Sequence, residues 1–424
     1  MMGILINNTK IEKKANKKLD FVLVLFFFFA TIYGTMAIFV ENMYVRAIKD
    51  FWLGILVAYV LYKLVFSYKI NRLIFKLGTV YLIIFIVSVL SLFFADNTLI
   101  NWIYGIKITL LPIGMLFVGY YHCNSNGDRL IKILSILYAM VLFTWVIQYF
   151  MGLDKLLAFG YEYAVNVKNF GDKLRLPSLL GTPDSYALYI AIVSLVIQNS
   201  NFLNKRYKIK IFLIITTFLF LFLSTIRTAL LLWLMAQGLT AVISVLKNKK
   251  RTFLLKCAIF FMFLPMAIIV AFLKMKDTGI LSVYSLTDRF THWGLFNQPL
   301  FSSEGIIGKG LGNVGAASVR LEETGTSNWH YGVDNQFLAI YQQMGIVGVI
   351  LFGAFFFIIL LNLLNSLKKS EDKEYRIYAL TFSMVLGTLA SCVFTNTLEL
   401  YPFNIIFWFY TGAALKGYSA NGLK

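Results

Sequence analysis

The stretch WHYGVDNQFLAIYQQMGIVGVILFGAFFFIILL, residues 329–361, decides the fold. It begins with aromatic and polar residues, passes through Asp334 and Asn335, and then contains no charged residue up to position 361. An uncharged apolar run of this length is sufficient to cross the hydrocarbon core of a bilayer, which is about 30 Å thick. The sequence therefore predicts a membrane-spanning helix that begins directly after a polar segment.

The rest of the chain repeats this apolar pattern. Of the 424 residues, 59% are hydrophobic and 14% are charged, and the mean hydropathy of +0.74 is far above that of a soluble protein. We therefore expect an all-α fold: a polytopic integral membrane protein, with one membrane domain over residues 1–424 and about twelve transmembrane helices. The expected spans are residues 20–40, 50–67, 77–95, 99–120, 130–150, 184–199, 209–224, 226–246, 253–273, 335–363, 377–396 and 399–416. The first follows a lysine-rich head like that of a signal peptide, but its length predicts an uncleaved helix.

The distribution of charge predicts how the chain crosses the membrane. The formal net charge is +19, and most lysines and arginines fall on one side if the N-terminus is inside the cell. Because basic residues stay on the cytoplasmic side of short loops, this pattern predicts a multi-pass protein of the cytoplasmic (inner) membrane with both termini cytoplasmic. It also argues against nucleic acid as a partner. The scattered cysteines, Cys123, Cys257 and Cys392, predict neither a disulfide framework nor a metal site.

Two long segments lie outside in this topology. Residues 151–183 form the first long outer loop, and residues 274–334 form the main extracytoplasmic loop. Both contain aromatic residues and glycines rather than low-complexity sequence, so we expect ordered structure, including a short helix over residues 287–293. The glycines between positions 305 and 315 follow no expected strand and lie on the side away from ATP, which favours turns over a phosphate-binding loop.

Three arginines stand out because they lie on the outer side, against the charge bias. Arg175 precedes a proline and a glycine at the entry to a span, and Arg227 lies where two apolar runs meet with almost no loop. Arg289 stands four residues before Trp293, which places both on one face of a helix. They are either ordinary interfacial charges that reach the lipid headgroups or ligands for an anion.

Two further polar residues lie just before the span at 335–363. Asp334 is a suitable N-cap for that helix, and its carboxylate is also suited to accept a proton from a sugar hydroxyl. Both roles are compatible. His330 is either a hydrogen-bonded loop residue or a second proton acceptor.

These residues resemble the motif of the O-antigen ligase and polymerase family. In that motif a His or Asp and a small polar residue precede G-x-x-G, as Asp334-Asn335 precede Gly345-Ile346-Val347-Gly348 here. Arg175, the segment from Ser224 to Arg227, Arg289 with Trp293, and Gly308-Lys309-Gly310-Leu311-Gly312 are similar to further motifs of the family in the same order. The resemblance covers residues 170 to 350.

The resemblance implies transfer of a glycan from an undecaprenyl diphosphate carrier to an acceptor hydroxyl at the outer membrane face. Such a glycosyltransferase is inverting and needs no metal and no cofactor, because arginines stabilise the leaving diphosphate bidentately. Asp334 and Arg289 are the implied catalytic residues. The implied substrate-binding residues are Arg175, Arg227, Asn335, His330 and Trp293.

The residue at position 334 separates two activities within this family. Ligases that attach O-antigen to lipid A core carry a His where this chain has Asp334, although His330 lies four residues upstream. The Asp form resembles polymerases that join lipid-linked repeat units into capsule or lipopolysaccharide O-antigen chains, which work beside a flippase and a chain-length regulator. A ligase is the alternative. A flippase or transporter of lipid-linked sugar is a third interpretation, although the halves of the chain show no repeat.

Overall fold

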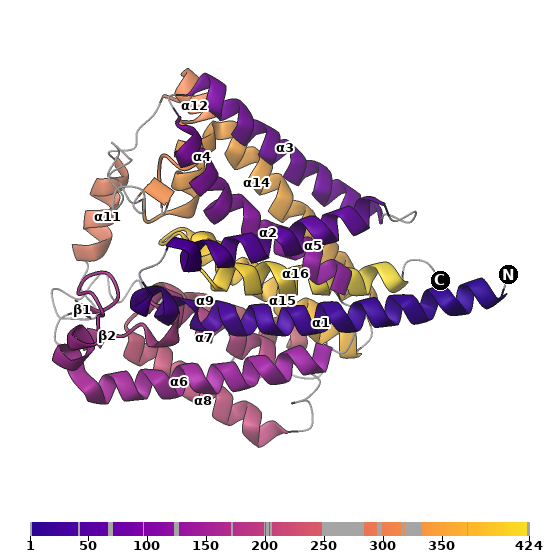
Figure 1. Cartoon of the computed structure of the whole chain (residues 1–424), viewed down its shortest axis with the longest axis horizontal. Coiled ribbons are helices and arrows are strands. Elements are labelled where there is room, and N and C mark those ends of the chain that lie inside the picture. Colours follow the sequence, from indigo (N-terminus) through magenta and orange to yellow (C-terminus); the bar gives the residue numbers. More distant parts are fainter. Residues whose placement is uncertain are drawn as a thin grey trace. The chain divides into compact units, whose positions relative to one another are not determined.

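The structure is a computed structural model that consists mainly of helices (Figure 1). It describes residues 2–40, 43–66, 71–95, 97–122, 127–170, 173–198, 200, 203, 206–247, 284–294, 299–315, 317–318, 333–370 and 372–421. Backbone contacts divide the chain into two compact units. Unit 1 contains residues 1–63, 115–230 and 401–424, and unit 2 contains residues 64–114 and 231–400. The expectation of one membrane domain over residues 1–424 stays a prediction.

The class of a helical, membrane-embedded protein is confirmed. Among the described residues, seven helices are long and apolar enough to cross a membrane: Lys18–Phe39, Arg72–Phe94, Leu99–His122, Arg129–Ala158, Tyr207–Ser224, Arg227–Lys247 and Gln336–Lys369. Helices also form at α2 (Met43–Val65), α7 (Pro183–Gln198), α15 (Asp372–Cys392) and α16 (Phe403–Asn421), where spans were expected. The expected span at 253–273 lies outside the described residues. A total of twelve spans therefore stays a prediction.

The core of unit 1 is helix α7, which is apolar on all sides and almost entirely buried. It contacts α6 (Gly127–Ala158), α8 (Tyr207–Ser224) and α16, and α1 (Met2–Phe39) runs beside α6 (Figure 1). A helix that is hydrophobic all round has no face to present to water and belongs in an interior. Helix α5 (Gly114–His122) approaches α16 closely, since a Cβ at Gly119 would lie 1.9 Å from the carbonyl oxygen of Phe409.

Ordered structure in residues 151–183 is confirmed, but it includes two strands that an all-α expectation does not contain. Strands β1 (Lys168–Phe170) and β2 (Lys173–Arg175) pair antiparallel with Lys168 opposite Arg175. A 3-10 helix, η3 (Ser178–Leu180), follows and leads into α7. Within unit 1, the hairpin lies at one end, and the N-terminus of α1 and the C-terminus of α16 lie at the other (Figure 1).

Unit 2 is built around α14 (Gln336–Lys369), which contacts α3 (Arg72–Phe94), α12 (Ser303–Ile307) and α15 (Figure 1). Near it, α4 (Leu99–Gly105) continues as the π-helix η1 (Ile106–Leu110) and the 3-10 helix η2 (Leu111–Ile113). This change of helix type coincides with Pro112, which has no N–H to donate to the helical ladder. Short π-helical turns inside helices are frequent at functional sites.

The glycine segment of unit 2 forms turns against α14, which confirms the expectation of turns. Gly308 and Gly345 have positive φ values of 87° and 64°, and Gly345 breaks the regular geometry of α14. A Cβ at Gly345 would lie 2.2 Å from the carbonyl oxygen of Ile306, and one at Gly308 would lie 2.4 Å from the carbonyl carbon of Gln343. Gly345, the first glycine of the G-x-x-G motif, therefore allows the glycine segment to lie directly on the helix backbone.

Candidate functional site

Two of the predicted arginines lie together in unit 1. Arg175, at the end of β2, donates from Nε to Thr225 Oγ1 at 2.8 Å and from its terminal nitrogen to the Thr225 carbonyl oxygen at 3.2 Å. Its guanidinium lies 4.3 Å from the ring centre of Phe170, and that of Arg227 lies 5.2 Å from the same ring. The Phe170 ring is thus shared by two cations from separate parts of the chain.

The backbone around Thr225 explains how Arg227 reaches this place. Thr225 caps the C-terminus of α8 in a left-handed conformation with φ of 57°, and α9 (Arg227–Lys247) begins two residues later. The hairpin then brings Phe170 and Arg175 onto this tight connection. We name Arg175, Arg227 and Phe170 the arginine pair site. Two partly buried guanidinium groups at one place create a positive potential suited to a phosphate or diphosphate.

The other predicted site lies in unit 2. Arg289 belongs to α11 (Tyr284–Gly294), whose range confirms the helix expected over residues 287–293. One terminal nitrogen of Arg289 donates to the Phe394 carbonyl oxygen at 2.6 Å, and the other lies 3.9 Å from Asp334 Oδ2. The side chain of Asp334 is 64% exposed, against 33% for Arg289. The arginine is therefore anchored to the backbone, and the carboxylate is accessible to a substrate.

Asp334 does not cap α14, so that part of the expectation is wrong. The N-cap is Asn335, whose Oδ1 accepts from the amides of Phe337 at 3.0 Å and Leu338 at 3.1 Å. Asn335 has the extended backbone typical of an N-cap, with φ of −149° and ψ of 114°. Its role seen here is structural, and its predicted contact with substrate stays a prediction. Asp334 is left just outside the helix.

The remaining predicted site residues are Trp293 and His330. Trp293 lies on α11, four residues after Arg289, and its ring contacts that of Phe290 with centroids 5.1 Å apart. His330 lies outside the described residues. Unit 2 thus brings Arg289 and Asp334 together, with Trp293 on the same short helix.

An apolar cavity of about 320 Å³ lies against α14 in unit 2. It begins at Gln336 and Phe337, directly after the Asp334-Asn335 pair, and continues along the helix to Leu360. Gly353 lines it, and a Cβ at this position would meet nothing within 4 Å. The cavity is suited to a narrow apolar chain, because it is lined almost entirely by hydrocarbon and aromatic side chains.

Several residues of these sites have no local signal in the sequence. Phe170, at the end of β1, is an ordinary aromatic residue in the sequence until the fold brings the two arginines to it. Phe394 contributes only a carbonyl oxygen. Glu399 is different: it is an acid at the first residue of the predicted span 399–416, and it is only 3% exposed. A carboxylate inside a membrane-spanning region is a recognisable signal for function.

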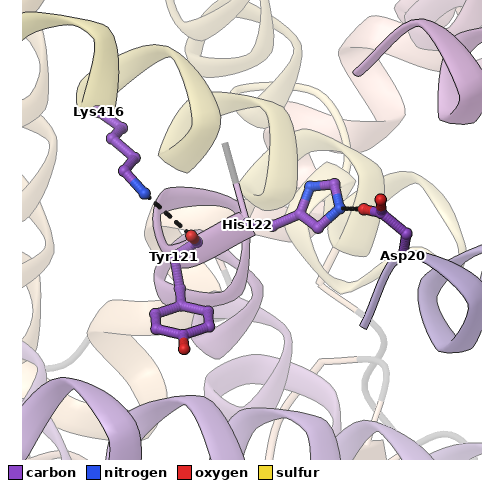
Figure 2. A network of polar contacts seen from close by, with 4 residues as sticks. All are labelled: Asp20, Tyr121, His122 and Lys416. Carbon is purple, nitrogen blue, oxygen red and sulfur yellow. Dashed lines mark hydrogen bonds and ion pairs between the residues drawn. The ribbon is translucent and has the colours of Figure 1, made fainter. Parts of the chain in front are cut away.

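Unit 1 contains a second polar network, which the sequence did not single out. Asp20 on α1 and His122 on α5 are joined through Asp20 Oδ1 and His122 Nε2, and Lys416 on α16 donates to the Tyr121 carbonyl oxygen at 3.0 Å (Figure 2). His122 is buried, and its ring lies 5.6 Å from that of Phe409. The network ties together three helices that are far apart in the sequence.

No protein-family model matches the sequence, and no curated protein matches it. Support for a function therefore comes from the chemistry and geometry of the residues themselves.

Proposed function

We propose that the protein is a polysaccharide polymerase that joins undecaprenyl-diphosphate-linked repeat units at the outer face of the cytoplasmic membrane. The main support is the placement of Asp334 beside Arg289, directly before a helix long enough to cross a membrane. A carboxylate and a guanidinium at such a place can act on a polar group attached to a membrane lipid. The resemblance of the surrounding residues to O-antigen ligases and polymerases points to the same chemistry.

The proposed reaction is a displacement at the anomeric carbon of the donor glycan. The acceptor hydroxyl oxygen bonds to that carbon, and the bond from the carbon to the diphosphate oxygen breaks. Asp334 accepts the hydroxyl proton, which is the role of a general base. Arg289 stabilises the negative charge that develops on the leaving diphosphate, without a metal. Arg175 and Arg227 are proposed to bind diphosphate as well, since both are expected on the outer side and both lie against the ring of Phe170.

The cavity on α14 supports a lipid-linked substrate. One end of the cavity is lined by Gln336, two residues after Asp334, and its lining is apolar. A polyprenyl chain placed there would leave its diphosphate near the start of the helix, where Arg289 lies. This continuity joins the proposed chemistry to a substrate that stays in the membrane.

The decisive experiment uses the purified, full-length protein with a single lipid-linked repeat unit. A polymerase converts it into a ladder of chain lengths on the lipid carrier, and Asp334→Asn abolishes the ladder. A ligase, the alternative within this family, would instead transfer preformed chains to a lipid A core acceptor and leave the single repeats unjoined. The absence of a ladder with folded protein and intact substrate would refute the polymerase.

One observation favours a transport function as the second candidate. Asp20 and His122 lie at the ends of two helices that are long and apolar enough to cross a membrane, and ionisable residues of membrane segments often mark transport pathways. A flippase would move lipid-linked repeats without joining them. In cells that lack this protein, loss of the repeats from the outer leaflet, rather than their accumulation there, would favour this function.

A further inference from the structure

Glu399 is a buried carboxylate in unit 2 that the proposed reaction does not use. It ends the 3-10 helix η6 (Thr397–Glu399), which follows α15, and only 3% of its surface is exposed. Burial of an acid in an apolar region is costly unless hydrogen bonds compensate it. Its partners should therefore show what the carboxylate is retained for.

Two hydrogen-bond partners of Glu399 come from other segments of unit 2. Gln336, the first residue of α14, donates from Nε2 to Glu399 Oε1 at 3.1 Å, and Thr109 of the π-helix η1 donates to the same oxygen at 3.4 Å. The Gln336 amide is also held at its other end, because its Oε1 accepts from the Leu398 amide at 3.2 Å. Two hydrogen bonds thus fix the Gln336 side chain on the segment that contains Glu399.

The same segment also holds the catalytic arginine. Arg289 donates to the carbonyl oxygen of Phe394, five residues before Glu399, at 2.6 Å. Asp334 precedes Gln336 by two residues in the chain. The connection from Phe394 to Leu400, which we name the α15–α16 connector, therefore contacts Arg289 directly and also contacts Gln336, two residues after Asp334.

We propose that Glu399 is a positioning residue that sets Asp334 against Arg289 by fixing the first residue of α14 to the α15–α16 connector. This role rests on the proposed function only for its effect on turnover. The contact itself also predicts a local stabilisation of α14 that does not depend on any activity. A misplacement of about 1 Å at a reacting group can cost on the order of 100-fold in rate, so such a clamp has functional value.

The first test measures order at the start of α14 by hydrogen–deuterium exchange of the full-length protein in detergent. Glu399→Leu removes the acceptor of Gln336 and Thr109 and should make the amides of residues 336–342 exchange about tenfold faster or more. Glu399→Gln keeps an acceptor oxygen and should leave exchange within about threefold of the wild type. Equal exchange in all three proteins would overturn the proposal, whatever reaction the protein catalyses.

Swapping the two side chains tests the contact between Gln336 and Glu399 directly. Gln336→Glu places two carboxylates together and should accelerate hydrogen–deuterium exchange of the amides at the start of α14. The double variant Gln336→Glu with Glu399→Gln restores a hydrogen bond between an amide and a carboxylate, and it should return the exchange rate toward that of the wild type. Thr109→Val should have a smaller effect in the same direction. Thr381→Val is the matched control, since Thr381 is buried in unit 2 but bonds to the Ile377 carbonyl of its own helix. A double variant whose amides exchange as fast as those of Gln336→Glu would contradict the proposed contact between Gln336 and Glu399.

The last test separates positioning from general stability. For equal amounts of folded protein, Glu399→Leu should lower kcat for joining lipid-linked repeats by about 10- to 100-fold while the KM for the donor changes less than about threefold. An unchanged kcat would show that Glu399 only stabilises the fold. The wild type could make no polymer while the single variants and the double variant show the predicted hydrogen–deuterium exchange. That result would support the positioning of α14 by Glu399 and refute the polymerase function.

Discussion

The arginine pair site of unit 1 and the Arg289–Asp334 site of unit 2 use the same side chain in different surroundings. In unit 1, two cations share the ring of Phe170, and Thr225 holds one of them through its hydroxyl and carbonyl oxygens. In unit 2, one cation is held by a backbone carbonyl and stands 3.9 Å from a carboxylate. The first site is defined by two cations and an aromatic ring, whereas the second combines a cation with a carboxylate.

This difference separates binding from chemistry. Two guanidinium groups attract an anion but have no group that accepts a proton at neutral pH, because arginine stays protonated. The carboxylate of Asp334 is a proton acceptor, which neither Arg175 nor Arg227 can be. We therefore expect substitutions in unit 2 to lower turnover and substitutions in unit 1 to weaken substrate binding.

The largest effect should follow removal of the base. Asp334→Asn keeps the size and polarity of the side chain but should lower the rate of polymerisation by about 100- to 10,000-fold, since an amide cannot accept the hydroxyl proton. The measurement is the ladder of chain lengths formed from purified lipid-linked repeats. Glu304→Gln, at an exposed acid of α12 in the same unit, is the matched control and should stay near wild-type rate. A normal ladder from Asp334→Asn would assign the base elsewhere.

A smaller effect, of a different kind, is expected in unit 1. Arg175→Ala and Arg227→Ala each remove a charged donor and should raise the KM for the donor about tenfold while kcat changes little. Steady-state rates over a range of donor concentrations give both constants. Lys168→Ala removes a positive charge from the neighbouring strand β1 and serves as the control. A fall in kcat with constant KM would remove the distinction between the two sites.

The third prediction concerns the cavity on α14, which begins directly after the unit 2 site. Gly353→Leu adds a side chain into open space in the cavity and should weaken binding of a long polyprenyl donor about fourfold or more, because each displaced CH₂ contact is worth about 0.8 kcal/mol. A donor with a short, water-soluble chain should bind as in the wild type. Gly78→Leu on α3 also enters open space, but outside the cavity, and is the control. Equal losses for both donors would place the lipid chain elsewhere.

The sequence predicted the parts of these sites that depend on local signals. Hydropathy predicted the seven described helices that are long and apolar enough to cross a membrane. The bias of charge drew attention to Arg175, Arg227 and Arg289, two of which the fold does bring together. The glycines near α14 were correctly expected to form turns. Each of these signals is contained in a short window of residues.

The remaining parts depend on contacts between distant segments. Nothing near Phe170 indicates that two arginines will share its ring, and nothing near Phe394 indicates that its carbonyl will hold Arg289. The choice of Asn335 over Asp334 as N-cap is a shift of one residue between two good caps. It depends on where α14 begins. Gln336 is fixed there by Glu399 and Leu398, which lie more than 60 positions later in the sequence.

The smallest expected effect tests whether Asn335 caps α14 while the adjacent Asp334 does not. Asn335→Ala removes the acceptor for the Phe337 and Leu338 amides and should lower the free energy of unfolding by about 1 kcal/mol. Asn335→Asp keeps an acceptor oxygen and should restore most of that stability. Asp334→Ala should change stability by less than about 0.5 kcal/mol, because its side chain is largely exposed and its ion pair is long.

Denaturant unfolding of the purified protein, followed by circular dichroism, measures the free energy of unfolding of Asn335→Ala, Asn335→Asp and Asp334→Ala. Asn335→Ala should be less stable yet keep measurable polymerisation, whereas Asp334→Ala should be stable and inactive. The opposite assignment, with Asp334 carrying the stability and Asn335 the activity, would mean that α14 begins one residue earlier. The clamp of Gln336 by Glu399 would then place the wrong residue next to Arg289, so this comparison also tests the proposed site.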